Sequence, residues 1–338
     1  MLEPETLERL RTGKNLLAFS GGVDSSALYH LLQEERIAFD IAMVNYESRP
    51  QSGEEEAYAK ELAERDGKRL HLLRHPLKPS DFERQARKVR YSFFEEIAKN
   101  EGYDTLVTAH QLDDLLEWGL MQLCRGCGAA EFVGMRPVQK EESYTLVRPL
   151  LFTPKKRLLE YLERRGIRYF IDSSNLSDAH TRNRFRKEAA AFLMRESPEG
   201  IARSFRYMLE DKEELIGSVQ TVLRFERAVL LKRPGSESRT IRQIDRILKS
   251  EGYLLSAAQK REILARRSVV VGGVWVVVVE GERIWIAPYR RAKMPKRFRE
   301  LCRRCRIPPK IRPYLFSEGA EDTLLSELCG RMDEPFSS

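Results

Sequence analysis

Residues 20–26 carry the pattern that says most about chemistry, Ser-Gly-Gly-Val-Asp-Ser-Ser. An apolar run at 16–19 precedes it, and apolar residues spaced for one buried helix face follow it. We therefore expect a strand, a tight turn on two glycines, and a helix. The helix N-terminus would present free N–H groups and a positive dipole end, beside two serine hydroxyls and the Asp24 carboxylate. This combination favours a bound polyphosphate, with Mg²⁺ at Asp24.

The turn differs from the commoner phosphate-binding loop. That loop, G-x-x-x-x-G-K-[ST], places a lysine on the β- and γ-phosphates, and no lysine follows the glycines here. The pattern S-G-G-x-D-S instead resembles the PP-loop of N-type ATP pyrophosphatases. The resemblance implies cleavage of ATP between its α- and β-phosphates, with AMP carried onto a substrate. It assigns ATP binding to the seven residues of the loop: Ser20, Gly21, Gly22, Val23, Asp24, Ser25 and Ser26.

Strand-like and helix-like segments alternate over the first part of the chain. We expect strands at 15–19, 41–45, 69–73 and 105–109, separated by helices at 25–35, 54–66 and 82–100. Near-continuous apolar strands of this kind predict an α/β fold, a parallel sheet with helices on both faces. Ligands of such sheets bind beyond the carboxyl ends of the strands. The glycine turn, Asn45 and His110 should therefore meet in one crevice.

The second part of the chain reads as a smaller domain. Helical patterns dominate from 183 to 230, and a valine-rich stretch at 268–287 predicts a β-hairpin. Between the two parts we expect helices at 113–124 and 154–166, and a short strand at 167–171. We place the domain boundary after residue 215. Residues 1–215 would form a PP-loop ATPase domain, and 216–338 a helical domain with a β-hairpin.

Acidic residues form a second cluster, at 109–117, which reads Ala-His-Gln-Leu-Asp-Asp-Leu-Leu-Glu. In a helix that starts near Asp113, Glu117 lies one turn further along, and Asp114 lies beside them. Acids at a helix N-terminus are also ordinary caps. Arginine and glycine follow, in Arg125-Gly126-x-Gly128, and suit a loop that closes over phosphate or substrate.

A third cluster combines Asp172-Ser173-Ser174-Asn175 with three arginines, at 182, 184 and 186, and with Lys187. Arginine forks suit phosphates. The alternative is a capped helix with a solvated basic face.

The net charge of +8 on 338 residues is unevenly distributed. The window from Arg290 to Arg312 holds eleven Lys or Arg residues against one acid, Glu300. Such a block fits an RNA phosphate backbone, or else a solvated basic surface.

Other bulk features exclude several classes of protein. No uncharged apolar stretch is long enough for a membrane span, and the acidic N-terminus lacks a signal-peptide core, so we expect a cytoplasmic protein. The odd count of five cysteines argues against a disulfide framework. Two C-x-x-C pairs, 124/127 and 302/305, raise a zinc or iron–sulfur alternative. We rank it lower, because each pair lies in a segment with another explanation.

Together the three clusters resemble those of the tRNA(Ile)-lysidine synthases. The similarity runs through A-H-x-x-D-D-x-x-E, R-G-x-G, G-M-R-P, R-P-L-L and D-S-S-N…R-N-x-x-R, and spans about residues 14–190. The last of these motifs is the most specific. The chain departs from the family pattern at Tyr46, Gln111 and Trp118, where the family usually has His, His and Thr.

The resemblance implies a reaction, its ligands and the residues that serve them. ATP with Mg²⁺ would adenylate the wobble cytidine of a tRNA(Ile), and free L-lysine would then displace AMP. Catalytic roles fall to Asp24, Asp113, Asp114, Glu117 and Arg125; ATP binding also to His110, Arg182 and Arg184; lysine binding to Asp114 and Glu117; and Mg²⁺ binding to Asp24 and Asp113. Contacts to tRNA fall to Arg186, Lys187, Arg290, Arg291, Lys293, Lys296, Arg297, Arg303 and Arg304. A homodimer is left open.

Three alternatives remain from the sequence. A PP-loop tRNA 2-thiolase would need reactive cysteines or an iron–sulfur cluster, for which only the two C-x-x-C pairs could serve. An amidating synthetase would leave the basic C-terminal segment without a role. A catalytically decayed tRNA-binding protein fits the departures at Gln111 and Trp118.

Overall fold

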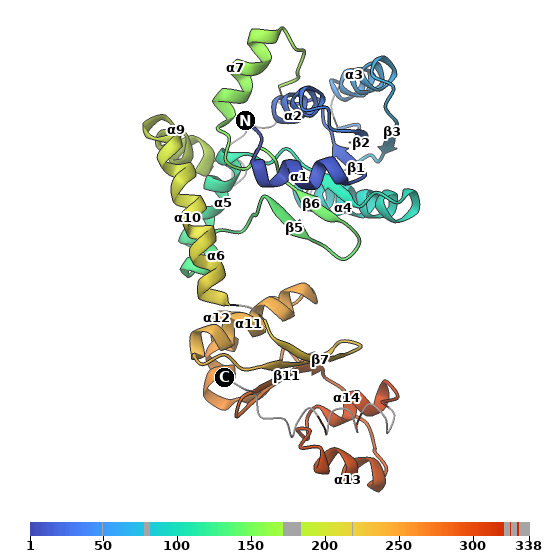
Figure 1. The fold of residues 1–338 in the computed structure, drawn as a ribbon, viewed down its shortest axis with the longest axis vertical. Coiled ribbons are helices and arrows are strands. Elements are labelled where there is room, and N and C mark those ends of the chain that lie inside the picture. The colour runs from blue at the N-terminus through green and yellow to red at the C-terminus, as the bar shows by residue number, and fades with distance from the viewer. Residues whose placement is uncertain are drawn as a thin grey trace. The chain divides into compact units, whose positions relative to one another are not determined.

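The computed structural model describes residues 1–48, 50–77, 82–171, 184–217 and 219–320, together with residues 325 and 330. Figure 1 shows the fold. The chain divides into two compact units, Met1–Asp211 and Lys212–Ser338; the sequence placed this boundary after residue 215. No helix in the described ranges is long and apolar enough to cross a membrane.

The first unit alternates helices and strands up to its fourth strand. Its elements are α1 (Pro4–Thr12), β1 (Asn15–Ala18), α2 (Val23–Glu34), β2 (Phe39–Asn45), α3 (Ser52–Arg65), β3 (Leu70–Arg74), α4 (Phe82–Glu101), β4 (Thr105–Val107), α5 (Leu112–Cys124), α6 (Ala129–Phe132), β5 (Val138–Lys140), β6 (Thr145–Val147), α7 (Lys155–Arg165), the π-helical turn η2 (Arg186–Ala190), α9 (Ala191–Glu196) and α10 (Pro198–Ile216), which continues into the second unit.

These strands form one six-stranded sheet in the order β3-β2-β1-β4-β6-β5. All neighbours pair in parallel except β5, which pairs antiparallel with β6. The predicted parallel α/β sheet is thus confirmed. The sequence missed β5 and β6, which have three residues each. It also predicted a strand at 167–171, where the structure has only a single parallel bridge between Gly22 and Phe170.

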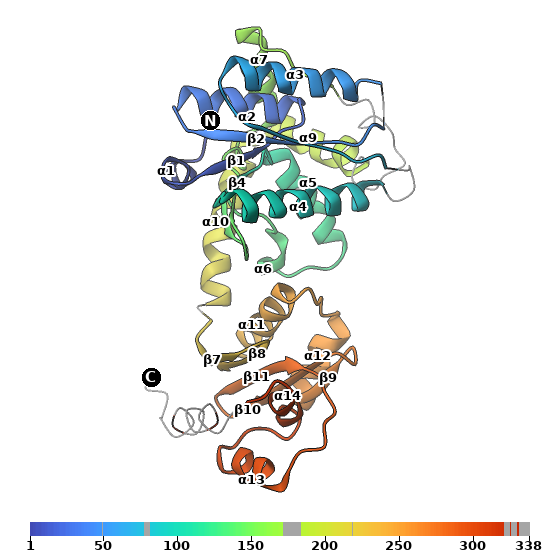
Figure 2. The same cartoon turned by 90° about the vertical axis from the view of Figure 1, so that its right-hand side faces the viewer.

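Helices cover both faces of this sheet, because successive residues of each strand point to opposite faces. Leu17, Ile41 and Val107 pack with α2, α3 and α7 in one buried cluster. Their neighbours Leu16, Ala42 and Leu106 pack with α4 on the other face. Figure 2 shows α2 and α3 on one side of the strands and α4 on the other. The sequences of these strands are nearly continuously apolar because both faces of the sheet are buried.

The second unit is built on antiparallel strands. Its elements are β7 (Thr221–Phe225), β8 (Ala228–Lys232), α11 (Glu237–Ser250), α12 (Ala257–Arg266), β9 (Ser268–Val271), β10 (Trp275–Glu280), β11 (Arg283–Pro288), α13 (Lys296–Arg304) and α14 (Arg312–Ser317).

The predicted hairpin is real, but it is part of a larger sheet. β10 and β11 pair antiparallel about the turn at Gly281, inside a five-stranded sheet of order β7-β8-β11-β10-β9. The helical prediction is therefore wrong for residues 221–230. α11 and α12 pack on one face of the sheet, and residues of α13 and α14 pack on the other.

A buried ion network fixes the loop beyond β2 in the first unit. The Glu56 side chain, 5% exposed, accepts hydrogen bonds from Arg74 at 2.6 and 3.0 Å, Lys60 at 2.7 Å and Asn45 at 2.8 Å. The Arg74 hydrogen bonds are the main reason that the pKa of Glu56 falls from 4.5 to about 2. Asn45 Oδ1 in turn accepts from the N–H of Glu47. The network therefore joins β2, α3 and β3 at the carboxyl edge of the sheet.

We expect Glu56→Gln to lower the free energy of unfolding at pH 7 by about 2 kcal/mol, because charged hydrogen bonds are lost. The lowered pKa means that this stabilisation is complete above about pH 4.5 and is lost as the pH falls toward 2. The difference in the free energy of unfolding between the variant and the parent should therefore become smaller in acid. Urea unfolding between pH 7 and pH 3.5 measures it, with Glu64→Gln, an exposed acid of α3, as the control. An equal gap at every pH would contradict this reading.

Candidate active site

The glycine turn at 20–22 has the backbone that the sequence predicted. Gly21 lies in the left-handed region with φ +73°, and a Cβ there would also come within 3.2 Å of the Phe170 ring. The carbonyl of Gly21 accepts a hydrogen bond from Phe170 N at 2.9 Å. A segment about 150 residues further along the chain thus braces the turn from one side.

The hydroxyls of the two serines that follow, Ser25 and Ser26, make hydrogen bonds within the turn. Ser25 Oγ accepts from the N–H of Ser20 at 3.2 Å and lies 3.1 Å from Ser20 Oγ. Ser26 is fully buried, and its hydroxyl donates to the carbonyl of Gly21 at 3.2 Å. Of the three serines of the turn, only Ser20 is exposed.

Helix α2 starts with an open N-terminus. Its N-cap is Gly22, which has no side chain to accept hydrogen bonds from the first-turn N–H groups. These groups, together with the positive end of the helix dipole, form an anion site. The position agrees with the predicted polyphosphate site, at the carboxyl end of β1.

Helix α5 is capped instead, and Gln111 is its cap. Gln111 Oε1 accepts from the N–H of Asp113 at 2.6 Å, and Asp114 Oδ2 accepts from the N–H of Gln111 at 3.2 Å. This reciprocal arrangement gives a physical role to one of the residues that departs from the family pattern. Asp113 is left facing away from its own helix start.

The N-termini of α2, α5 and α7 lie close together around the Asp113 carboxylate. Asp113 Oδ2 accepts a hydrogen bond at 3.0 Å from the N–H of Lys155, the first residue of α7. The ammonium group of Lys155 lies 4.0 Å from Asp24 Oδ2, in the first turn of α2. Asp24 and Asp113, which are 89 residues apart in sequence, are therefore neighbours through Lys155.

Burial shifts the ionisation of both carboxyls. It raises the pKa of Asp24 to about 7, against the opposing effect of Lys155 and with further upward contributions from Asp114 and Asp113. Burial likewise raises the pKa of Asp113, opposed by the hydrogen bond from Lys155 N. A cation placed among these acids would be stabilised by their negative charge and would favour their ionised forms.

The donor set fits Mg²⁺ held jointly with phosphates. Asp24 Oδ1 is buried and has no hydrogen-bond partner among the described residues, so a cation at this atom would satisfy it. Mg²⁺ sites in nucleotide enzymes commonly use one or two carboxylates and complete the shell with phosphate and water. No group of three or more His, Cys, Asp or Glu side chains within the described ranges forms a metal cage.

Glu117 and Arg186 have other partners than the sequence suggested. Glu117 is fully buried, and Arg186 forks onto it with Nε–Oε1 at 2.5 Å and Nη2–Oε2 at 3.2 Å. This pairing uses part of the hydrogen-bonding capacity of the Glu117 carboxylate, and it directs the Arg186 guanidinium, which remains 32% exposed, onto α5. The pair anchors η2 to α5, where a buried charge must be matched.

Of the other site residues predicted in the first unit, Arg125 lies far from this centre, His110, Arg184 and Lys187 lie within the described ranges, and Arg182 lies outside them. Arg125 is exposed at the far end of α5, about 18 Å along the helix from Asp113. Arg184 and Lys187 are exposed, and His110 Nδ1 lies 3.0 Å from Thr108 Oγ1. Arg182 and the Asp172–Asn175 motif fall among the residues that the structure does not describe.

Lys155 is a candidate site residue that the sequence analysis missed, because it contacts both Asp113 and Asp24. A signal for it exists: Lys155 and Lys156 open a helix whose first turn contains no acid. Cations are unfavourable at the positive end of a helix dipole. Local rules are broken in this way most often at functional sites.

The predicted basic residues of the second unit are on its surface. Arg290, Arg291, Lys293 and, on α13, Lys296, Arg297, Arg303 and Arg304 are all exposed. Cys302 lies on the buried face of α13, and Cys305, which follows the helix, is disulfide-bonded. The sequence analysis argued against a disulfide framework and did not foresee this one bond. Cys124 is exposed and Cys127 partly exposed, and both thiols are free.

Comparison with known proteins agrees with this geometry. A family model described as a PP-loop domain matches residues 4–193. A tRNA(Ile)-lysidine synthase of Wolinella succinogenes is 45% identical over 94% of this chain and 97% of its own length. The chain belongs to the tRNA(Ile)-lysidine synthase family. It is accordingly an enzyme of the ligase class, with a PP-loop ATP-binding domain.

Further members of the family cover the chain almost completely. The tRNA(Ile)-lysidine synthase of Campylobacter jejuni is 41% identical over 96% of this chain and 99% of its own length. That of Helicobacter pylori J99 is 40% identical over 92% of this chain and 91% of its own. Among solved structures, a U34-tRNA thiolase from Methanococcus maripaludis with a [4Fe-4S] cluster has a TM-score of 0.48 at 19% identity, covering 61% of this chain and 77% of that chain.

The raised pKa of Asp24 leads to a stability prediction for the metal-free protein. The usual pKa of 3.8 rises to about 7 in the folded state, so ionisation opposes folding increasingly from pH 4 to pH 7. Asp24→Asn should therefore melt at a higher temperature than the parent, by a margin that grows over this range and then levels off. Lys155→Met should melt lower above pH 7, because it removes the nearest cation. Thermal unfolding in EDTA measures both, and an Asp24→Asn margin independent of pH would refute the assignment.

Proposed function

We propose that this chain ligates the ε-amine of free L-lysine to C2 of the wobble cytidine in a tRNA(Ile) with a CAU anticodon, using ATP and releasing AMP and pyrophosphate. The observation that carries the proposal is the meeting of Asp24, Asp113 and Lys155 beside an open glycine turn. The proposal is also supported by the similarity of this chain, over nearly its whole length, to proteins named tRNA(Ile)-lysidine synthase.

ATP would bind with its phosphates over the turn. The first-turn N–H groups of α2 and the exposed hydroxyl of Ser20 are donors on that side, and Lys155 supplies a positive charge close to them. The backbone of Gly21 and Gly22 permits a close approach, since neither has a side chain there. Asp24 and Asp113 would hold Mg²⁺, which supplies charge neutralisation of the phosphates when bound.

The reaction would then proceed in two steps. In the first, the O2 oxygen of the cytidine bonds to the α-phosphorus of ATP, and the bond to the β-phosphate breaks to release pyrophosphate. In the second, the lysine amine bonds to C2, the C2–O bond breaks, and AMP leaves with that oxygen. The amine gives up a proton as the new C–N bond forms.

Asp114 is our candidate for holding the lysine ammonium. Its charge acts on both Asp24 and Asp113, so it lies within the electrostatic range of the reacting centre. Glu117 would act indirectly, by fixing Arg186 and thereby η2 against α5. We also propose that ATP or its phosphates are contacted by four further residues: His110, Arg125, Arg182 and Arg184. These contacts would form only when the protein closes over bound substrate.

The second unit would hold the body of the tRNA. Exposed cations on and before α13 suit the phosphate backbone, which gives affinity without sequence information. Because ATP, free lysine and tRNA are all found in the cytoplasm, we place the reaction there.

Incubation with labelled lysine, ATP and a tRNA(Ile) transcript with a CAU anticodon tests the activity directly. We expect lysine in the tRNA and one AMP for each lysine incorporated. Asp24→Ala should reduce AMP release by about 100-fold or more, because charge stabilisation at the phosphates is lost. Glu64→Ala, at an exposed position of α3, should leave it unchanged. Mass spectrometry separates the alternatives, since added sulfur would indicate a 2-thiolase and an unmodified tRNA would indicate a decayed, binding-only protein.

Charge reversal on α13 tests the proposed tRNA surface. Truncation from residue 290 would be uninformative, because Phe298 and Cys302 belong to the core of the second unit. The double variant Arg303→Glu/Arg304→Glu should weaken tRNA binding at least tenfold and lower the slope of log K against log salt by about 0.9 per lost phosphate contact. ATP binding should not change.

The matched control is Arg261→Glu/Arg266→Glu on α12, which changes the same number of charges in the same unit. Equal losses of tRNA affinity in both double variants would show that only net charge matters, and would contradict a specific surface on α13.

A further inference from the structure

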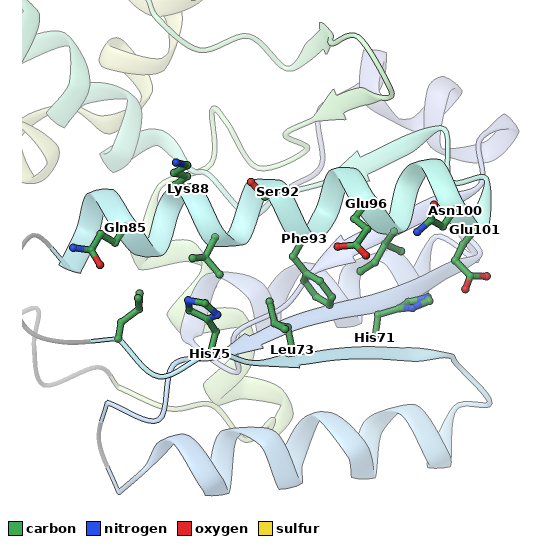
Figure 3. Close-up of a pocket in the computed structure, with 13 residues that line it drawn as sticks. His71, Leu73, His75, Gln85, Lys88, Ser92, Phe93, Glu96, Asn100 and Glu101 are labelled. Atoms are coloured by element: carbon green, nitrogen blue, oxygen red, sulfur yellow. The ribbon is translucent and has the colours of Figure 1, made fainter.

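A groove of about 670 Å³ lies along the edge of the first sheet, between β3 and α4. Its floor is apolar and includes Leu73, Val89 and Phe93. Polar side chains, among them His75 and Gln85, line the rest. In Figure 3 the Phe93 ring lies between α4 and β3, and His75 lies beneath the N-terminal half of the helix. Nothing in the proposed reaction at the glycine turn uses this groove.

One end of the groove lies at the carboxyl edge of the first sheet, the edge of the candidate active site, because His75 and Leu77, which follow β3, are among its lining residues. β3 runs parallel to β1 with β2 between them, so their carboxyl ends are about 10 Å apart. His75 is the first residue after β3, and Ser20 is the second residue after β1. One or two nucleotides of an extended single strand span this separation.

Charge along α4 is polarised toward the same edge. Its first half carries four exposed cations: Arg84, Arg87, Lys88 and Arg90. Its second half carries mainly acids, including Glu95, Glu96 and Glu101. The basic half follows the carboxyl end of β3 in the chain. A polyanion that reaches the active site would therefore meet positive charge first at this end of the groove.

We propose that this groove binds the single-stranded nucleotides that adjoin the reacting cytidine in the anticodon loop. Their bases contact the Phe93 ring and His75, and their phosphates lie on the basic turns of α4. Aromatic faces beside a basic track are the usual means of holding single-stranded nucleic acid. The inference rests on the proposed function, and it adds a nucleic-acid site within the first unit to the surface on α13.

Binding of an anticodon stem-loop RNA to the full-length chain tests the groove without catalysis. Lys88→Glu should weaken binding about tenfold and reduce the salt slope by about 0.7, the value for one phosphate contact on a single strand. The matched control is Lys99→Glu. Lys99 is an exposed lysine three turns further along the same side of α4, and its 2.8 Å pair with Glu95 is on the surface. We expect less than a twofold effect from it.

A second measurement locates the contact. A 5-iodouridine placed next to the wobble cytidine should, on irradiation, crosslink to a peptide containing Phe93 or His75. Equal effects of Lys88→Glu and Lys99→Glu on RNA binding would overturn the inference, and so would crosslinks found only outside β3 and α4. Binding of a peptide in the groove, without binding of RNA there, would also overturn it. If lysine is transferred but these tests fail, the groove assignment alone is wrong. If they succeed and no lysine is transferred, the proposed function is wrong and the groove stands.

Discussion

The contact between Asp113 and the first residue of α7 holds the candidate active site together. Through Lys155 it joins the N-termini of α5 and α7, and the ammonium of the same lysine reaches Asp24 in α2. Three positive helix ends and two acids with raised pKa values therefore share one small volume. The helix ends repel a cation and the acids repel an anion, so neither ion alone is favoured in this site. An anion and a divalent cation bound together satisfy both sets of groups.

The parallel sheet makes this convergence possible. α2, α5 and α7 each begin after a strand ends, so their N-termini all lie at the carboxyl edge. Phe170 braces the glycine turn, while Glu56 and its partners fix the neighbouring loop. The serine hydroxyls of the turn donate hydrogen bonds to its own backbone carbonyls and so help to hold the left-handed conformation of Gly21. The groove beside β3 extends the same edge outward toward the surface.

Much of this could be predicted from the sequence, because local patterns determine it. The strand–turn–helix around Gly21 follows from apolar spacing and turn residues, as do the helices α2, α3, α4, α5 and α7, whereas the short helix α6 was not predicted. Contacts between distant segments could not be predicted in this way. Nothing local indicates that Lys155 N would bond to Asp113, or that Arg186 would pair with buried Glu117. β7 and β8 were mistaken for helix because their residues include good helix formers; burial outweighs that preference in β8, and β7 pairs with β8 at the edge of the sheet.

Hydrogen exchange of the full-length chain, with and without ATP and Mg²⁺, examines most directly whether the glycine turn is the nucleotide site. Binding there should slow exchange of the backbone amides at 21–26 and at Lys155, with little change in the second unit. Protection confined to other segments, with the amides of the turn exchanging at their original rates, would contradict the assignment of the site and with it the proposed chemistry.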